Sequence, residues 1–525
     1  MDLPHASSHP IKSFDPNMLI ASVDIGTSST RALLFDGARH TGQHAAVEYP
    51  LLGGEPGAAE LDPEQVTNAV VDCLARLSQV AHVDAVALSS AMHSLIAVDA
   101  SGNPLTPAFT WADSRASAAA QTLKQSTEAE VIYAATGVPL HPMSPLAKLL
   151  WLSETRPEVF ARADKFVSIL EFVCHRLFGI WQVDHGIASS SGLYSLAARD
   201  WDATALKVAG IGRARLSLLV APGTILRGLK AEPATRTGLT AQTPFVLCGS
   251  DGCLANLGAG ALANPSAAQM CRAVLTIGTS GAFRMTVDRP ATDTQMRSFC
   301  YTLAERQFVI GGATNGGGMP LRWLRDNFPR LRGGLESAEP YAALAQIAAQ
   351  AAPGAGGLLF HPYLAGERAP LWNADARGSF IGLNFRHGPP QLVRAVMEGI
   401  LFNLAMILDV LEELGGACNE ILAGGGFARS PFWLQMAADL FGRPLIVADN
   451  PETTAQGAAL MALTALGGCA DLAAAVALLA PATRRIEPDA KTHELYARLQ
   501  PIYTDIPAKL AASYAELSRF QKDFP

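Results

Sequence analysis

The stretch that decides the fold runs from Met18 to Phe35 and reads MLIASVDI-GTSST-RALLF. Two apolar runs, 18–25 and 32–35, enclose a short turn of glycine and hydroxyl residues, and this pattern predicts a β-hairpin. Glycine lets backbone N–H groups approach an anion closely, and the hydroxyl groups add hydrogen-bond donors. On these residues alone, an ordinary hairpin turn and a phosphate-binding turn are equally good interpretations.

Two charged residues flank this turn. Asp24 lies at the end of the first run, where a carboxylate cannot hold a phosphate but can hold the Mg²⁺ that accompanies one, directly or through water. Arg31 follows the turn and could neutralise charge on a phosphoryl group. Both residues suit a phosphate site, so the decision rests on the remainder of the chain.

A second segment of the same design lies near the middle of the chain. The apolar run Ala273–Ile277 is followed by Gly278-Thr279-Ser280-Gly281 and then by Ala282–Met285. This repeat of strand, hydroxyl-rich turn and strand predicts a second domain built like the first, with a phosphate held between the two facing turns. The predicted division is a loose tail at 1–17, an N-terminal domain at 18–264 and a C-terminal domain at 265–525.

Strands alternate with helices over the whole chain. An amphipathic helix is expected over 62–80, and Pro389–Leu414 carries one apolar stripe before Gly415-Gly416 ends it. A short strand at 420–423, three glycines and a helix at 432–441 follow. Alternating βα units of this kind predict an α/β fold with mixed sheets.

Composition excludes several classes of protein. The 525 residues are 49% hydrophobic and 17% charged, which is too apolar for a disordered chain. A net charge of −7 without basic clusters argues against nucleic-acid binding, and no run approaches the ~18 uncharged apolar residues of a membrane span. The eight cysteines contain no CxxC pair, and Met1–Asn17 has no signal-peptide core. We therefore expect a cytoplasmic protein without a membrane partner.

The glycine-rich segments of this chain match neither of two common nucleotide-binding motifs. The P-loop pattern GxxxxGK[ST] is absent, because the dipeptide Gly-Lys does not occur. Gly258-Ala259-Gly260 imitates a dinucleotide fingerprint, but 252–257 is expected to begin a helix and not a strand. These observations exclude a P-loop NTPase at motif level and argue against a Rossmann dehydrogenase.

Polar residues lie at the ends of three expected elements of the first domain. Asp251 comes after the strand at 245–248 and begins a helix, so it fits an ionised base or a helix N-cap, of which the cap is the commoner. Met92-His93 and Trp111–Arg115 end consecutive elements. A Trp ring with His, Asp and Arg nearby is typical of a polyol site, although each residue alone fits packing or a surface ion pair.

Together and in this order, these pieces resemble the FGGY family of carbohydrate kinases, which belongs to the actin-like ATPase superfamily. The resemblance covers about Leu19 to Leu466, and five motifs in register make it specific. They are the phosphate motifs 24–31 and 277–281, the adenosine motif 422–430, the N-terminal signature 143–154 and the C-terminal signature 378–398.

The resemblance implies two actin-like, ribonuclease-H-like domains with mixed sheets that face each other across a cleft. It implies that Asp251 is the catalytic base, which reverses the preference for a cap, and that Asp24 is associated with Mg²⁺. The implied cofactors are ATP and Mg²⁺. The implied nucleotide contacts are Gly26, Thr27, Ser28, Ser29, Arg31, Gly278, Thr279, Gly318, Gly425, Gly426 and Ser430, and the implied sugar contacts are Met92, His93, Trp111, Asp113 and Asp251.

Three segments narrow the choice of substrate within the family. Thr110–Arg115, Ser250–Gly258 and Ala365–Trp372 are most similar to the gluconate kinases of the family, so the expected reaction converts gluconate to 6-phosphogluconate with the γ-phosphoryl group of ATP. Xylulose kinases share the Met-His pair and the Trp-x-Asp pattern, so a pentulose or polyol kinase stays the alternative. Glycerol kinases normally carry Arg-Glu where this chain has Met92-His93, which argues against them.

A sugar acid brings a carboxylate, which needs a cationic or N–H-rich partner. Arg115, His93 and His141 are the candidates, and the sequence does not choose among them. An actin-like ATPase switch and a sugar-binding regulator without kinase activity are two further classes, against which the polyol set and Asp251 argue. The expected partners are a sugar or sugar acid and ATP, with a homodimer left open.

Overall fold

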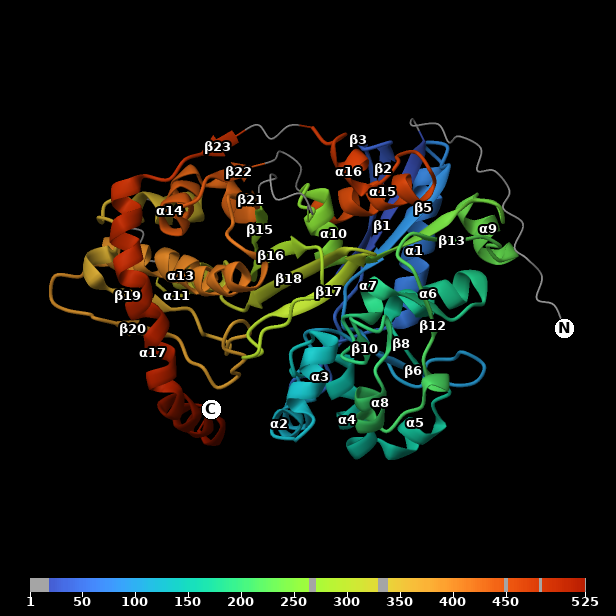
Figure 1. Ribbon diagram of the computed structural model, residues 1–525, viewed down its shortest axis with the longest axis horizontal. Helices are drawn as coiled ribbons and strands as arrows, with labels where there is room; N and C mark the ends of the chain where they lie inside the picture. The colour runs from blue at the N-terminus through green and yellow to red at the C-terminus, as the bar shows by residue number, and fades with distance from the viewer. Residues whose placement is uncertain (1–17, 264–270, 329–338, 448–451, 481–483, 525) are drawn as a thin grey trace.

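The computed structural model describes residues 18–263, 271–328, 339–447, 452–480 and 484–524. These residues form two α/β halves that lie side by side, each built around one large mixed sheet (Figure 1). The α/β class and the mixed sheets expected from the sequence are confirmed. The expected tail at 1–17 and the expected boundary at 264/265 lie outside the described residues, so the division into domains stays a prediction.

The N-terminal sheet has six strands in the described residues, in the order β13-β14-β5-β1-β2-β3. Its central strands β1, β5 and β14 run parallel, and the other neighbours pair antiparallel. These central strands are buried along almost their whole length, as expected where both faces of a sheet are covered. The strands are β1 Leu19–Ile25, β2 Ser29–Asp36, β3 Arg39–Glu48, β5 Ala85–Ser90, β13 Thr224–Leu226 and β14 Phe245–Ser250.

Helices and short strands complete the N-terminal half. The first helix begins as predicted, because the Asp62 carboxylate accepts hydrogen bonds from the backbone N–H groups of Glu64 and Gln65. The helices are α1 Pro63–Ser78, α2 Ser117–Lys124, α3 Ala129–Thr136, α4 Pro145–Thr155, α5 Pro157–Arg162, α6 Ile169–Phe178, α7 His185–Ala188, α8 Ala203–Ala209, η1 Arg213–Arg215, α9 Ala231–Thr237 and α10 Asp251–Gly258. The short strands are β4 Glu60–Leu61, β6 Ile96–Val98, β7 Ala108–Phe109, β8 Lys165–Val167, β9 Gln182–Asp184, β10 Tyr194–Ser195, β11 Asp200–Trp201 and β12 Leu218–Val220.

The C-terminal sheet repeats this design. Over the described ranges it has seven strands in the order β17-β18-β16-β15-β21-β22-β23, and β15, β21 and β22 run parallel. Its hairpin of β15 and β16 is the second hairpin predicted from the sequence. The strands are β15 Arg272–Ile277, β16 Gly281–Val287, β17 Phe299–Ala304, β18 Gln307–Thr314, β21 Glu420–Gly424, β22 Leu445–Val447 and β23 Arg484–Ile486, and β19 Leu359–His361 pairs separately with β20 Ser379–Ile381.

The long apolar helix expected in the C-terminal half is α13, and its central turns are buried. Its last residue is Gly415, and the C-cap is Gly416, whose φ of 89° suits glycine. None of the helices in the described ranges combines the length and apolar character needed to cross a bilayer. The helices of this half are α11 Met319–Asn327, α12 Pro340–Ala348, η3 Ala355–Gly357, α13 Pro389–Gly415, η4 Gly426–Arg429, α14 Pro431–Phe441, α15 Thr453–Ala465, α16 Leu472–Val476 and α17 Ala490–Asp523.

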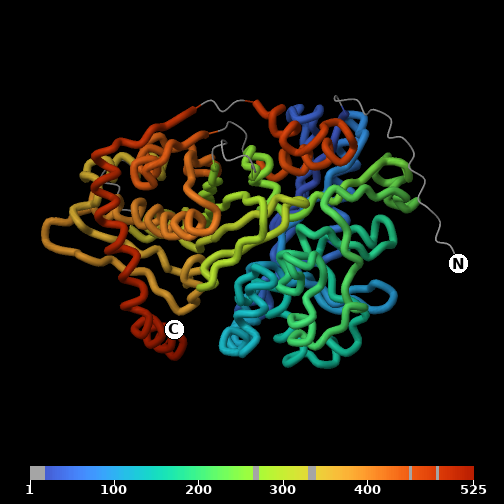
Figure 2. Tube along the Cα trace, viewed as in Figure 1, coloured from blue at the N-terminus to red at the C-terminus, as the bar shows by residue number. Residues whose placement is uncertain are grey.

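Helix α15 packs on the sheet of the other half. It contacts β1, β5 and β14, and Figure 2 shows this red segment of the trace beside the blue strands. It also crosses α10 with backbone against backbone: a Cβ added at Gly258 would lie 1.9 Å from the Thr453 carbonyl oxygen, and one at Gly457 would lie 2.0 Å from the Leu254 carbonyl oxygen. The glycine that imitated a dinucleotide motif is therefore required for helix packing.

Parallel pairing brings the ends of three strands to one edge of the N-terminal sheet. In the register, Ile25 of β1 lies opposite Ser90 of β5, which in turn lies opposite Ser250 of β14. A β-bulge shifts the register of β14 between Leu247 and Gly249, where φ is 106°. The polar turns that follow these three strands consequently meet at one place.

Candidate functional site

The first turn is tightly bonded at the end of β1. The Gly26 N–H donates to the Ser29 carbonyl oxygen over 3.0 Å, and the Tyr49 hydroxyl donates to the Gly26 carbonyl oxygen over 2.7 Å. The Thr27 hydroxyl accepts a hydrogen bond of 3.0 Å from the indole N–H of Trp111. The turn predicted to bind phosphate therefore touches the tryptophan predicted to bind a sugar.

Asp24 has one carboxylate oxygen occupied and the other without a partner. Its Oδ2 accepts a hydrogen bond of 3.0 Å from Arg31, which also donates to Glu452 over 2.9 Å. Its buried Oδ1 has no hydrogen-bond partner among the described residues. Burial raises the pKa of this carboxyl, against the opposing charge of Arg31. A buried oxygen in this condition fits an ordered water or a cation.

A cation at this place would need ligands beyond the protein. In the ranges that the structure describes, no group of three or more His, Cys, Asp and Glu side chains could hold a metal ion. Magnesium prefers oxygen ligands and usually keeps several waters, bound through one or two carboxylates and substrate phosphates. The single free oxygen of Asp24 suits that mode of binding.

Three glycine-rich segments meet at the end of β15. The Gly318 N–H donates to the Gly278 carbonyl oxygen over 2.7 Å, and a Cβ added at Gly317 would lie 2.2 Å from the carbonyl carbon of Ser280. At Gly425, where φ is 91°, an added Cβ would lie 2.5 Å from a β15 carbonyl oxygen. Side chains are excluded at these contacts, so the backbones of the three segments lie against one another.

Part of this glycine cluster is exposed and could contact a ligand, whereas the Ser430 hydroxyl beside it is already engaged in a hydrogen bond. Gly278, Thr279, Gly425 and Gly426 are exposed, as backbone that contacts a ligand must be. Ser430 is engaged locally, because its hydroxyl accepts the N–H of the third residue of α14 over 3.3 Å as the helix N-cap.

Asp251 is the first residue of α10 and not its cap. The cap position belongs to Ser250, and Oδ1 of Asp251 accepts the Gly252 N–H over 2.7 Å. The side chain is half-buried, and burial together with the charge of Asp24 raises its pKa to about 6. A Cβ added at Gly252 would lie 2.9 Å from the methyl carbon of Met92, so this side chain approaches the start of the helix.

His93 presents a neutral ring where the two halves meet. Its Nδ1 donates to the Ser190 carbonyl oxygen over 2.7 Å, and its Nε2 lies 3.4 Å from the hydroxyl of Tyr301 on β17. Burial and the charge of Lys148 lower its pKa to about 3. Because Nδ1 carries the proton, Nε2 is an acceptor, and the long contact from the Tyr301 hydroxyl shows that it can accept a hydrogen bond from a hydroxyl group.

Trp111 makes a cation–π contact with an arginine of the C-terminal half. The indole is 37% exposed, and the guanidinium of Arg368 lies 5.3 Å from the ring centroid. Arg368 is held on its own side by hydrogen bonds to Asn315 Oδ1 at 2.9 Å and to the Thr314 carbonyl oxygen at 3.1 Å. The candidate sugar contact is therefore built from both halves.

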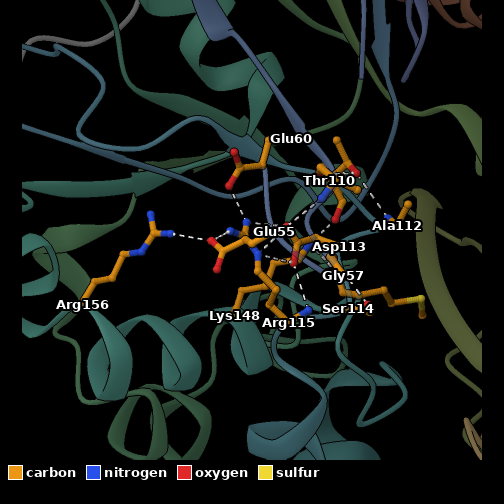
Figure 3. Close-up of polar contacts among 12 residues, drawn as sticks. Glu55, Gly57, Glu60, Thr110, Ala112, Asp113, Ser114, Arg115, Lys148 and Arg156 are labelled. Atoms are coloured by element: carbon orange, nitrogen blue, oxygen red, sulfur yellow. Dashed lines mark hydrogen bonds and ion pairs between the residues drawn. The ribbon is translucent and has the colours of Figure 1, made fainter. Parts of the chain in front are cut away.

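Asp113 belongs to a closed network of charges (Figure 3). Both of its oxygens accept hydrogen bonds from Arg115, and Oδ2 also accepts the Ala59 N–H over 3.2 Å. The Arg115 side chain is 6% exposed and also pairs with Glu55 at 2.7 Å and with Glu60. Its charge is therefore compensated inside the protein, and Asp113 is oriented by this pairing.

The structure brings most of the predicted residues to two neighbouring clusters, at the ends of β1, β5 and β14 and at the end of β15. Sequence reasoning assigned no role to Arg284, Tyr301 and Arg368, which come to the same place from the C-terminal half. One signal was visible, because Arg284 is the single charge in the otherwise apolar stretch Ala282–Met285.

Comparison with known proteins gives a consistent match. The model of the N-terminal domain of the FGGY family of carbohydrate kinases matches residues 19–258, and that of the C-terminal domain matches residues 273–466. The chain is 39% identical to a gluconokinase of Bacillus subtilis (strain 168) over 509 residues, which cover 95% of this chain and 98% of the relative. Two crystal structures from Lactobacillus acidophilus, each 34% identical, cover 95% of this chain and are themselves covered fully: a gluconate kinase with a TM-score of 0.89 and a ligand-bound xylulose kinase with a TM-score of 0.90.

Proposed function

Because this chain belongs to the FGGY family of carbohydrate kinases, we propose that it transfers the γ-phosphoryl group of ATP to gluconate, which gives 6-phosphogluconate. It is a phosphotransferase that acts on an alcohol group, with a sugar and ATP as substrates. The observation that carries the choice of gluconate is the 39% identity to a gluconokinase over nearly the whole chain.

Asp251 is the proposed catalytic base. Its carboxylate accepts the proton of the attacking hydroxyl while the hydroxyl oxygen bonds to the γ-phosphorus, and the bond to the bridging oxygen breaks so that ADP leaves with the electron pair. A pKa of about 6 supports this role, because the group is ionised at pH 7 and still basic enough to take a proton.

The proposed nucleotide site uses turns from both halves. Backbone N–H groups and hydroxyls of such turns bind phosphate oxygens without a P-loop. The exposure of Gly278 and Thr279 supports this role, and so does the contact of Gly318 with the second turn. The proposed phosphate contacts are Gly26, Thr27, Ser28, Ser29, Arg31, Gly278, Thr279 and Gly318, and the proposed adenosine contacts are Gly425, Gly426 and Ser430.

Mg²⁺ is the proposed metal, and Asp24 is the residue that would hold it, directly or through water. Bound Mg²⁺ would neutralise charge on the phosphate oxygens during transfer. The unpartnered Oδ1 of Asp24 supports this assignment. Arg31 orients the carboxylate by occupying its other oxygen.

The proposed sugar site lies between the two clusters. Trp111 offers a ring face for the C–H edges of a polyol, and Nε2 of His93 can accept a hydrogen bond from a hydroxyl group. Met92 lies beside the start of α10, where it would pack on the substrate next to Asp251. Asp113, fixed by its arginine, completes the proposed set.

A panel of acceptors tests the proposal. ADP formation is measured with ATP and Mg²⁺ in the presence of gluconate, xylulose, glycerol or no acceptor, and gluconate is expected to give the highest kcat/KM. Faster turnover of xylulose would overturn the choice of gluconate as substrate but would not affect the assignment to the family. ADP formation that no acceptor stimulates would instead favour an ATPase switch.

A pentulose such as xylulose is the second candidate substrate. The observation in its favour is that a ligand-bound xylulose kinase is as similar in sequence and in structure as the gluconate kinase from the same species. The two candidates differ in charge, because gluconate carries a carboxylate and xylulose is neutral. The residue that binds a carboxylate would therefore distinguish them.

A further inference from the structure

The three carboxylate partners expected from the sequence do not have the required charge. Arg115 is compensated by Asp113, Glu55 and Glu60. Burial lowers the pKa of both His93 and His141 to about 3, so both rings are neutral at pH 7. A buried carboxylate would need a cation that these residues do not supply.

Arg284 is a cation that faces the charge of Asp251 without bonding to it. It extends from the middle of β16, is half-buried, and makes no hydrogen bond or ion pair with any residue that the structure describes. A Cβ added at Gly252 would lie 3.4 Å from its Nε, so glycine at the start of α10 gives this side chain room. Arg284 thus reaches from the C-terminal half to the residue next to Asp251.

Arg368 brings a second cation to the same region. Its guanidinium lies over Trp111, and only two of its N–H groups are used, for Asn315 and Thr314. Its guanidinium makes no ion pair with a described carboxylate. The neighbouring Glu367 carboxylate accepts hydrogen bonds from Thr314, Asn315 and Asn403 and from the backbone N–H of Arg368. Burial lowers the pKa of Arg368, the opposite charge of Glu367 works against this shift, and the like charge of Arg284 adds to it.

We propose that Arg284, supported by Arg368, binds the carboxylate of the sugar-acid substrate. The inference rests on the proposed function, because gluconate carries this group and a neutral sugar does not. Asp251 and Glu367 offset part of the charge of the two guanidinium groups, and the N–H groups that remain unused can bind a carboxylate through paired hydrogen bonds. The transferred phosphoryl group is the other oxyanion of the reaction, but the position of Arg368 over Trp111 favours the substrate side.

The test compares gluconate with gluconamide, in which a neutral amide replaces the carboxylate. Wild-type protein and Arg284→Met are assayed with both acceptors, and kcat and KM are determined separately. Loss of a charged hydrogen-bonded pair is expected to raise KM for gluconate about 10- to 100-fold and leave kcat and KM for gluconamide within about three-fold. Arg284→Lys keeps the charge and is expected to recover part of the loss.

Arg289→Met is the matched control. Arg289 is exposed just beyond β16, so the same change of charge there is expected to leave both acceptors unaffected. Equal loss of kcat for both acceptors in Arg284→Met would show that Arg284 acts on Asp251 or on the phosphoryl group instead of the carboxylate, and would overturn the proposal. Unchanged kinetics would overturn it as well. Wild-type protein that ignores gluconate would overturn the proposed function itself, whereas failure of the variant alone would overturn only this inference.

Discussion

The amine of Lys148 is enclosed by three backbone carbonyl groups. Its Nζ donates to the carbonyl oxygens of His93, Thr110 and Met143 at 2.6, 2.7 and 2.9 Å, and the residue is 1% exposed. Burial lowers its pKa to about 7, yet only the ammonium form supplies three N–H donors for three acceptors. Lys148 therefore fixes the two segments that carry His93 and Trp111, and the region of this network is drawn in Figure 3.

Lys148→Met is expected to lower the free energy of unfolding by about 3 kcal/mol or more, because three buried carbonyl groups lose their donor at about 1–3 kcal/mol each. It is also expected to raise KM for the sugar, since the two segments are released. Urea denaturation measures the first effect, with the exposed Lys207→Met as a control expected to stay within about 0.5 kcal/mol. A loss no larger than that of the control would contradict the role.

The pKa of Asp251 predicts a pH dependence of turnover. A base with a pKa of about 6 is protonated below that pH, so kcat/KM is expected to rise about ten-fold from pH 5 to pH 7 and then to level off. Initial rates over this range check the expectation, with thermal unfolding recorded at each pH to show that the protein stays folded. A flat profile between pH 5 and pH 7 would contradict it.

Single residues were predictable from the sequence only where the signal is local. Asp251 follows a strand and glycine, and the position at the end of β14 is visible in that pattern. The compensation of Arg115 was not visible, because Glu55 and Glu60 lie 60 and 55 positions earlier in the chain. Charge partners depend on tertiary contacts, so the sequence could propose Arg115 for a carboxylate but could not exclude it.

At the scale of elements, the crossing of α10 and α15 joins a segment late in the chain to the N-terminal half. In a helix interior, replacing glycine by alanine ordinarily stabilises by about 0.5–1 kcal/mol. At this crossing a methyl group added at Gly457 would lie 2.0 Å from the Leu254 carbonyl oxygen, so we expect alanine to lower the free energy of unfolding instead of raising it. A destabilising change from glycine to alanine is therefore a direct test of this helix packing.

Gly457→Ala is expected to destabilise the fold by about 1–3 kcal/mol, because the two helices must separate to accept the methyl group. Gly212→Ala is the control, since its added methyl group meets open space. Thermal or urea unfolding compares the two variants. Stabilisation by Gly457→Ala would show that the helices do not cross in this way.

Elements were predictable where period and turn residues define them. Both hairpins and the helix at α13 follow from apolar runs, glycine-rich turns and an apolar stripe. The return of α15 to the other half was not predictable, because its sequence specifies only a helix that is apolar on all sides. That pattern indicates burial, while the surface that buries it is decided by the whole fold.

At the scale of the whole molecule, the candidate site is assembled from both halves. Arg31 bonds Glu452 at 2.9 Å, Lys124 donates to the Trp372 carbonyl oxygen at 2.9 Å, and the Cys300 N–H donates to the Gly137 carbonyl oxygen at 2.9 Å. Each pair joins one half to the other. These contacts bring the two halves together as the proposed transfer requires, with the base on the N-terminal side and the phosphoryl group on the C-terminal side. The cleft between them stays a prediction.

The change Asp251→Asn tests this account most directly. Asp288→Asn, beyond the end of β16, makes the same change outside the site and is the control, expected to keep wild-type kinetics. Folding raises the pKa of Asp251, so its ionised form opposes folding at neutral pH, and Asp251→Asn is also expected to raise Tm at pH 7.5.

The decisive measurement is kcat of Asp251→Asn with ATP, Mg²⁺ and gluconate, alongside gluconate binding by calorimetry. The account predicts a kcat at least about 100-fold below that of the wild-type protein, with Kd for gluconate within about three-fold. A kcat close to the wild-type value would contradict it.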